Sequence, residues 1–166
     1  MAAAWKAGNR EAGEKLCAGL RGAVFGVCWA LAGSRTPAEE AMQEAFVRIL
    51  SGLPSYAMGR PFRPWALQIA RNAAIDALRK GRKEPETDAP EPVHMETPLS
   101  GLLRRERLEE IAAAIRALPA VSREVLVLKY AQGLANDEIA AILGVGMEVL
   151  WMRLSRARRE IQVRLA

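Results

Sequence analysis

One segment, residues 84–100, limits what this chain can fold into. It reads EPETDAPEPVHMETPLS and contains four prolines and five acidic residues but no Lys or Arg. Prolines at this density interrupt helices, and so polar a composition cannot bury a core. Because structureless loops of this length are uncommon inside compact domains, we interpret residues 83–100 as a flexible linker between two domains, 1–82 and 101–166. A long loop within a single domain is the alternative.

Both flanking parts of the chain show helical patterning. Ala, Leu, Arg and Glu dominate, apolar residues recur at helical spacing, and strand signals are nearly absent. The sequence therefore predicts an all-α protein made of two small helical domains. The expected helices cover residues 10–32, 37–51 and 62–81 in the first domain and 102–117, 121–131, 136–143 and 147–164 in the second.

The second expected helix has a specific start signal. Thr36 would be its N-cap, Pro37 would take the first helical position, and Glu39 would complete a capping box with Thr36. The Gly and Pro content of residues 51–60 then predicts a loop before the third helix.

Composition argues against several kinds of site. Cys17 and Cys28 are too few for a disulfide framework, and one helix cannot bring them together, so we expect small core residues in a reducing cytoplasm. With one histidine, His94, there is no Cys/His cluster, and we expect neither a metal nor another cofactor. No run of eighteen apolar residues and no secretory signal pattern is present, so we expect no membrane insertion. The chain lacks a catalytic constellation and is not expected to be an enzyme.

The C-terminal part has the pattern of a helix-turn-helix. A short helix with acidic residues in its first turn is followed by the tight turn Gly144–Gly146, in which Val145 can fill the corner between helices. In the last helix one apolar stripe should face the core, formed by Leu150, Leu154, Ala157 and Ile161. In such a motif the second helix enters the major groove of DNA.

The stripe also determines which residues of this last helix point outward. At 100° per residue Met152, Ser155, Arg156 and Arg159 face away from it, and Trp151 lies on its flank. Between Arg153 and Arg164 there are five arginines and one Glu. Arginine suits bidentate contacts with guanine and contacts with phosphates, so we expect a DNA-reading face. A solvated basic face is the alternative, because the net charge of +5 is only mildly basic.

A second basic surface is expected on the helix of residues 62–81. Arg71 and Asn72 are adjacent donors for phosphates or base edges, and Asp76 can pair with Arg79 or Lys80. Trp65 is expected to be core rather than a stacking platform. The preceding loop carries Ser55, Tyr56 and Met58, which can contact an unpaired base.

The helix of residues 37–51 has a different character. Its surface is acidic and apolar, with Glu39, Glu40, Gln43, Glu44 and Phe46. Such a surface suits a protein partner and not DNA.

Three segments of the chain, in this order and spacing, are similar to a known family. They are residues 36–50 (TPAEEAMQEAFVRIL), 60–80 (RPFRPWALQIARNAAIDALRK) and 118–161, which contains the helix-turn-helix. They resemble the extracytoplasmic-function sigma factors of bacterial RNA polymerase, small sigma factors with only regions 2 and 4 and a variable linker. The resemblance covers nearly the whole chain and implies a region 2 three-helix domain and a region 4 helix-turn-helix domain.

The resemblance also implies roles for these surfaces. The acidic helix would dock on the clamp helices of the largest subunit of the polymerase core, and the linker would run toward the RNA exit path. The next loop and helix would open and read the −10 element as a single strand, through Ser55, Tyr56, Arg60, Arg63, Arg71, Asn72, Arg79 and Lys80. The helix-turn-helix would read the −35 element as a duplex, through Val149, Trp151, Met152, Arg153, Ser155, Arg156 and Arg159. The protein would then act by binding and not by catalysis, as a cytoplasmic alternative sigma factor.

The expected recognition helix departs from the family at three positions. The family usually has Thr where Val149 stands, Lys or Arg at Trp151, and Ser at Met152. Loss of these polar groups should weaken hydrogen bonding to the −35 element, for which contact with thymine methyl groups can partly compensate. The alternative is a sigma-like adaptor whose apolar face binds an anti-sigma protein without reading DNA. An anti-sigma factor is an expected partner of the leading hypothesis as well.

Overall fold

The computed structural model describes residues 2–81 and 101–166, and side chains within 2–80 and 109–166. The described part is helical and contains no strand, as the sequence predicts. The first part holds α1 (Ala2–Lys6), α2 (Arg10–Ala32), α3 (Arg35–Gly52) and α4 (Phe62–Gly81), with the 3₁₀ turn η1 (Leu53–Ser55) after α3. The predicted linker, residues 83–100, lies wholly outside the described residues, and the domain boundaries stay a prediction.

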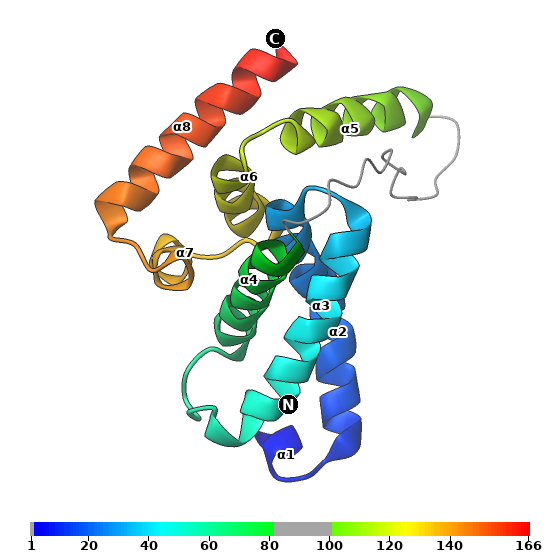
Figure 1. Ribbon diagram of the computed structural model, residues 1–166, viewed down its shortest axis with the longest axis vertical. Coiled ribbons are helices and arrows are strands. Elements are labelled where there is room, and N and C mark those ends of the chain that lie inside the picture. The colour runs from blue at the N-terminus through cyan, green and yellow to red at the C-terminus, as the bar shows by residue number, and fades with distance from the viewer. Residues whose placement is uncertain (1, 82–100) are drawn as a thin grey trace.

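The first domain is built by α2, α3 and α4, which lie side by side in the lower half of Figure 1. Their contact faces are lined with small residues, because alanines recur on α3 and α4 every three or four positions. This spacing places them on one face of each helix and lets the backbones approach closely. The largest fully buried side chains here are Val24, Val27, Ile49 and Leu67.

The start of α3 differs from the predicted start. The helix begins at Arg35, and its N-cap is Ser34, whose backbone is extended and whose side chain makes no capping hydrogen bond. Thr36 therefore lies inside the first turn and is not the N-cap, so the predicted capping box is wrong. Glu39 instead accepts a hydrogen bond from Nε of Arg35 at 2.8 Å. Pro37 is tolerated as the third helical residue, because N–H groups in the first turn have no intrahelical acceptor.

The second domain contains α5 (Gly101–Arg116), α6 (Ala120–Leu126), α7 (Asn136–Leu143) and α8 (Met147–Leu165). A π turn, η2 (Val127–Ala131), continues α6. Gly144 ends α7 with φ +64°, a left-handed conformation that glycine adopts without strain. Val145 then packs against the core, as the sequence predicts.

The two domains pack against each other. Helix α6 and η2 contact α2, and α7 contacts α4. Val125 and Leu128 are fully buried and belong to the same continuous core as Val24 and Leu67 of the first domain. This docking was not predicted from the sequence, since it depends on contacts between residues about a hundred positions apart.

By length and composition α2 is long and apolar enough to cross a membrane, a property shared by the core helices of soluble proteins. Its inner face, with Val24, Val27 and Cys28, is fully buried against the rest of the protein. Burial raises the pKa of the Cys28 thiol to about 12, which keeps it protonated at neutral pH. Both cysteines are free, as expected, although Cys17 is only half-buried.

Candidate nucleic-acid interface

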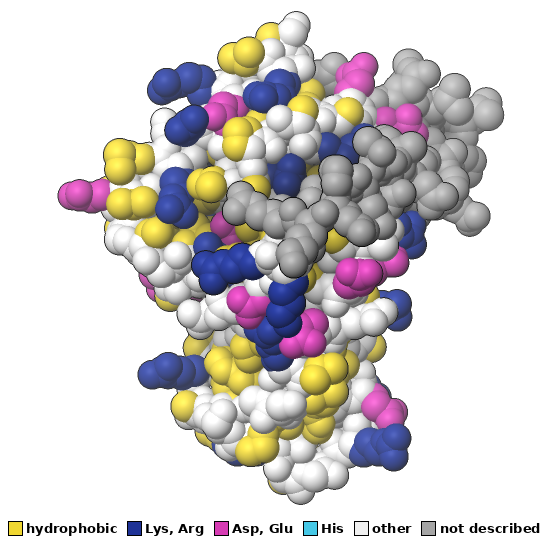
Figure 2. Space-filling model, viewed as in Figure 1, with side chains coloured by type: hydrophobic (Ala, Val, Ile, Leu, Met, Phe, Trp, Pro, Cys, Tyr) yellow, Lys and Arg dark blue, Asp and Glu magenta, His cyan; other side chains and the backbone are white. Residues whose placement is uncertain are grey.

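The outward face of α8 is the first candidate surface. Leu150, Leu154 and Ala157 are buried and Ile161 is half-buried, which confirms the predicted inward stripe. Consequently Trp151 and Met152 are 57% and 64% exposed. Figure 2 shows hydrophobic side chains gathered near the start of α8, with Lys and Arg side chains close by.

Some polar side chains of α8 are exposed, and others form ion pairs or hydrogen bonds with neighbouring residues. Ser155 and Arg159 are exposed. Arg156 is paired with Glu160 at 2.9 Å, and Nε of Arg158 donates to the Tyr130 hydroxyl at 2.8 Å. The nearby Ser122 hydroxyl and the Arg156 guanidinium hold the pKa of Glu160 below its ordinary value. Arg153 is half-buried, and its charge acts on Glu124 of α6.

The loop before α4 is held by an aromatic cluster. The ring of Tyr56 lies 4.9 Å from that of Trp65 and 5.2 Å from that of Phe62, and Trp5 of α1 contacts Phe62. Trp65 is thus a packing residue, as expected. Tyr56 is only 4% exposed, and its hydroxyl donates to the Arg60 carbonyl. In this structure Tyr56 packs within the aromatic cluster, and its predicted contact with an unpaired base stays a prediction.

Other residues of this loop and of α4 remain accessible. Ser55, Met58 and Arg60 of the loop are exposed. On α4 the exposed polar residues include Asn72, Arg79 and Lys80, and Arg63 and Gln68 are exposed as well. Within the described residues Arg60, Arg79 and Lys80 form no ion pair with a carboxylate, so this surface is polar and basic.

Two other basic residues of α4 are already engaged by the second domain. Nε of Arg71 donates to Glu124 at 2.7 Å, and Nη2 of Arg63 donates to Oε1 of Gln132 at 2.8 Å. The side chain of Arg71 is largely buried by this contact. The structure therefore separates the predicted set into residues that make no hydrogen bond to the second domain and two arginines that do. Of these two, Arg71 is largely buried, whereas Arg63 remains exposed.

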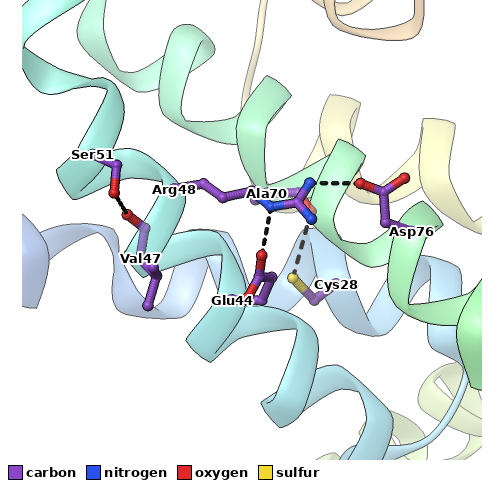
Figure 3. A network of polar contacts seen from close by, with 7 residues as sticks. All are labelled: Cys28, Glu44, Val47, Arg48, Ser51, Ala70 and Asp76. Carbon is purple, nitrogen blue, oxygen red and sulfur yellow. Dashed lines mark hydrogen bonds and ion pairs between the residues drawn. The ribbon is translucent and has the colours of Figure 1, made fainter.

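Asp76 does not form the expected pair within α4. It accepts a hydrogen bond from Nη1 of Arg48 at 2.6 Å, and Arg48 also donates to Glu44 at 2.7 Å, as Figure 3 shows. The Arg48 guanidinium lowers the pKa of Asp76, with smaller contributions from the charges of Arg79 and Lys80. The partner comes from α3 because the two helices pack side by side, a proximity that spacing within α4 does not reveal.

The outer face of α3 is the candidate protein-binding surface. Glu40, Gln43 and Glu44 are exposed, whereas Glu39 and Phe46 are half-buried. Val47 and Leu50 also lie exposed on this helix, next to these polar groups. The sequence analysis did not include these two residues. Helical spacing could have found them, because Val47 follows Gln43 by four residues and Leu50 follows Val47 by three, which places them on the same helical face.

Two family models match the chain. The model for Sigma-70 region 2 matches residues 17–84, and the model for Sigma-70, region 4 matches residues 108–161. The ECF RNA polymerase sigma factor EcfG of Rhodopseudomonas palustris is 30% identical over 135 residues, which cover 81% of this chain and 75% of that relative. The chain belongs to the extracytoplasmic-function sigma factors.

Another relative and a solved structure agree with this membership. The probable RNA polymerase sigma factor RfaY of Xanthomonas campestris is 31% identical, and the chain spans 41% of its length. The structure of the sigma factor CnrH of Cupriavidus metallidurans, in complex with the cytosolic domain of CnrY, has a TM-score of 0.72 and 27% identity. That similarity covers 99% of this chain and 94% of CnrH, so it extends over both sigma regions.

Region 2 thus corresponds to the helices that carry the acidic α3 face and the basic α4 face. Region 4 corresponds to the helix-turn-helix of α7 and α8. Within the described residues no group of His, Cys, Asp and Glu side chains has the geometry of a metal site.

Proposed function

We propose that this protein is an alternative sigma factor that directs bacterial RNA polymerase to promoters through three separate surfaces. The observation that carries the proposal is that both sigma regions occur in one chain, while the recognition helix α8 presents an accessible face rich in arginine. The mechanism is selective binding in the cytoplasm, where polymerase and promoter DNA are found.

The proposed polymerase surface is the outer face of α3. It combines the carboxylates of Glu40 and Glu44 with exposed Val47 and Leu50. Apolar residues surrounded by polar groups are typical of protein interfaces, and the negative charge makes this face a poor ligand for DNA. Its proposed partner is the clamp helices of the largest subunit of the polymerase core. Glu39, Gln43 and Phe46 complete the proposed surface.

The proposed −10 surface consists of the loop after α3 and the polar face of α4. Ser55, Arg60, Asn72, Arg79 and Lys80 are accessible for phosphates and bases of a melted strand. Capture of unpaired bases offsets part of the cost of melting the duplex. Arg63 and Arg71 join this set when their bonds to the second domain are broken.

The proposed −35 surface is the outward face of α8. Arg156, Arg159 and Ser155 are placed for phosphates and base edges, and Arg153 lies beside them. Val149, Trp151 and Met152 are exposed in the same turns, where they favour contact with thymine methyl groups over hydrogen bonding. We therefore expect a −35 element with thymines at the positions that face these side chains.

A sigma-like adaptor is the second candidate function. Exposed Trp151 and Met152 suit a protein partner, since Trp is a frequent interface anchor. In the solved structure of CnrH the sigma factor is bound to the cytosolic domain of CnrY, and an anti-sigma factor is a proposed partner of this chain too. The accessible basic residues of α4 and α8 favour the sigma factor, because an adaptor has no use for two DNA-binding faces.

Promoter selection with reconstituted holoenzyme tests the proposal. Core polymerase with this protein is expected to select promoters that share a −10 and a −35 element and to start transcription at a fixed distance from them. Core alone is the control. Stable binding to core without any selected start site would contradict the proposal and favour the adaptor.

A further inference from the structure

Helix α1 (Ala2–Lys6) belongs to none of the three surfaces proposed above, and it precedes the residues that match the region 2 model, which begin at residue 17. It has five residues. Isolated helices shorter than about 12 residues are marginal in water, so contacts with the rest of the domain hold α1 in place. Figure 1 shows α1 at the foot of the first domain, next to the loop that joins α3 to α4.

The turn between α1 and α2 has a defined geometry. Gly8 has a φ of +95°, a left-handed conformation that reverses the chain after α1. The side chain of Asn9 accepts from the backbone N–H of Ala12 at 3.0 Å and so caps α2, while its own backbone N–H donates to the Ala4 carbonyl at 2.9 Å. These bonds fold α1 back onto the first turns of α2.

The indole of Trp5 lies in the space that Gly13 leaves open on α2. Gly13 is buried, and a Cβ at this position would lie 2.3 Å from Nε1 of Trp5 and 2.5 Å from its Cδ1. Any larger residue would therefore displace the ring. A glycine within a helix costs about 0.5–1 kcal/mol relative to alanine, and at this position it makes room for Trp5. A Cβ at Gly22 of the same helix, by contrast, meets nothing within 4 Å.

Two adjacent residues of α1 contact the two ends of the loop of residues 56–61. Nζ of Lys6 donates to the carbonyl of Tyr56 at 2.7 Å, where η1 ends and the loop begins. The ring of Trp5 lies 6.3 Å from that of Phe62, the first residue of α4, in an edge-to-face arrangement that is favourable for aromatic pairs. One short helix thus holds both ends of the loop.

The same contacts position the accessible residues of the loop. The ring of Tyr56 lies 5.2 Å from that of Phe62, and its hydroxyl donates to the Arg60 carbonyl. Within the loop the backbone N–H of Arg60 makes a long hydrogen bond of 3.4 Å to the Ala57 carbonyl, which gives the loop little support of its own. The placement of exposed Met58 and Arg60 therefore depends on the aromatic rings, and through them on α1.

We propose that α1 is a strap that sets the conformation of the loop of residues 56–61 and thereby the base selectivity at the −10 element. Trp5 and Lys6 are positioning residues that act through Phe62 and Tyr56 rather than by touching DNA. The inference rests on the proposed function in its assignment of this loop to the −10 element. It adds a determinant of selectivity that lies outside the matched region 2 residues.

The core of the first domain does not depend on the strap. Helix α1 contains no buried residue, and Trp5 is only half-buried. The fully buried side chains Val24, Ile49 and Leu67 come from α2, α3 and α4. Loss of the α1 contacts should therefore loosen the loop while the three long helices stay packed.

The test compares the full-length chain with variants that remove or displace the strap contacts. Trp5→Ala removes the ring, Gly13→Ala displaces it without removing an atom, and Lys6→Met removes the donor. Trp5→Phe and Lys6→Arg are conservative variants that keep a ring and a donor. Gly22→Ala is the matched control for Gly13→Ala, since it makes the same change in the same helix in open space. Circular dichroism verifies that each variant is folded.

Two measurements follow the loop and its proposed effect. Hydrogen–deuterium exchange of residues 53–61 in the free chain measures local opening, and we expect at least about threefold faster exchange for Trp5→Ala and Gly13→Ala. Promoter selection by the holoenzyme should show at least about threefold weaker discrimination among bases of the −10 element, with an unchanged −35 preference. Lys6→Met should have a smaller effect in the same direction, and the conservative variants and Gly22→Ala should behave like the parent chain.

The outcomes separate positioning from general stability. Parent-like exchange in folded Trp5→Ala and Gly13→Ala overturns the strap, and so does faster exchange with unchanged −10 discrimination. Equal losses of discrimination at both promoter elements would show a general destabilisation and also contradict the proposal. If the parent holoenzyme selects no promoter, the proposed function is wrong, and the exchange rates still decide whether α1 holds the loop.

Discussion

Arg48 of α3 and Asp76 of α4 form an ion pair that links the proposed polymerase-binding helix to the proposed −10 helix. Nη1 of Arg48 lies 2.6 Å from Oδ2 of Asp76, and its Nε binds Glu44 on the outer face of α3. Both side chains of the pair are partly exposed, so its free energy is modest. Its main effect is to fix the orientation of the two functional faces.

The Arg48–Asp76 pair predicts a pH-dependent contribution to stability. Arg48 lowers the pKa of Asp76 in the folded protein, whereas in the unfolded chain an Asp titrates near about 3.9. The folded state therefore binds the proton less readily, and the stabilisation is present above that pH and lost as the pH falls through the folded pKa. Asp76→Asn should lower the unfolding temperature at pH 7 and have little effect in strong acid.

Thermal unfolding at several pH values measures this difference. Glu14→Gln, which removes an exposed carboxylate paired with Arg10 on the surface of α2, is the control and should change the curve little. A deficit of Asp76→Asn that persists undiminished at the acid end would show that the pair is not its cause.

The apolar face of α8 predicts an unusual DNA preference. The double substitution Trp151→Lys/Met152→Ser should change the preferred −35 sequence and add a phosphate contact, because both side chains are exposed on the recognition helix. Each added phosphate contact steepens the salt dependence of binding by about 0.9 in the log–log slope. Binding to duplex promoter DNA at a series of salt concentrations, together with promoter selection, measures both effects.

Val163→Ser is the control for this pair, since Val163 is exposed on the same helix but lies three turns away from Trp151. Unchanged DNA preference combined with loss of an anti-sigma partner would assign the face to that partner.

The exposed apolar residues of α3 predict a contribution to polymerase binding. Leu50→Ala should weaken binding to the core by about tenfold, equivalent to about 1.4 kcal/mol, if Leu50 is a central contact. The free energy of unfolding of the Leu50→Ala variant should differ from that of the parent chain by less than about 0.5 kcal/mol, because the Leu50 side chain is exposed in the free chain. Val121→Ala, an exposed apolar residue of α6, is the matched control. Titration of labelled core polymerase with each variant measures the affinity. Equal affinity of the Leu50→Ala and Val121→Ala variants would exclude Leu50 from the interface.

The glycines of α2 predict effects of different size at two positions one helical turn apart. A Cβ at Gly22 meets nothing within 4 Å, so Gly22→Ala should raise the free energy of unfolding by about 0.5–1 kcal/mol. A Cβ at Gly26 would lie 3.0 Å from Nε2 of Gln132, so Gly26→Ala should gain less and loosen the docking of the second domain. Denaturant unfolding and X-ray scattering measure the two effects. Equal gains at both positions, with unchanged scattering, would contradict the observed contact.

Gly33, the C-cap of α2, is a third glycine whose substitution gives a prediction. Its φ of +79° strains any other residue, and a Cβ would lie 3.0 Å from Nη2 of Arg123. Gly33→Ala should therefore destabilise the chain by about 1 kcal/mol. Gly59→Ala shares the positive φ but has open space around it, and it isolates the effect of the backbone from that of the Arg123 contact.

The residue pattern alone was enough to predict the helices and most of the outward surfaces. Leu150, Leu154 and Ala157 recur at helical spacing, so the direction of Trp151 and Met152 follows from geometry within one helix. The same is true of the exposed acidic residues of α3. Helical periodicity is a local property, and for that reason it can be read without knowledge of the rest of the fold.

Contacts between helices were decided by the tertiary structure. Asp76 has basic neighbours in α4 but pairs with Arg48 of α3, and Tyr56 is covered by the rings of Phe62 and Trp65. Periodicity predicts which side of a helix is buried, but it does not predict what lies against that side.

The sequence by itself determined two helical sigma regions, their order and the basic character of α8. Only the tertiary structure decided that region 4 docks on region 2 and that Arg71 binds Glu124, 53 residues away. The physical reason is that helix formation and amphipathic spacing depend on neighbours within a few residues, whereas an ion pair between helices depends on the packing of the whole core.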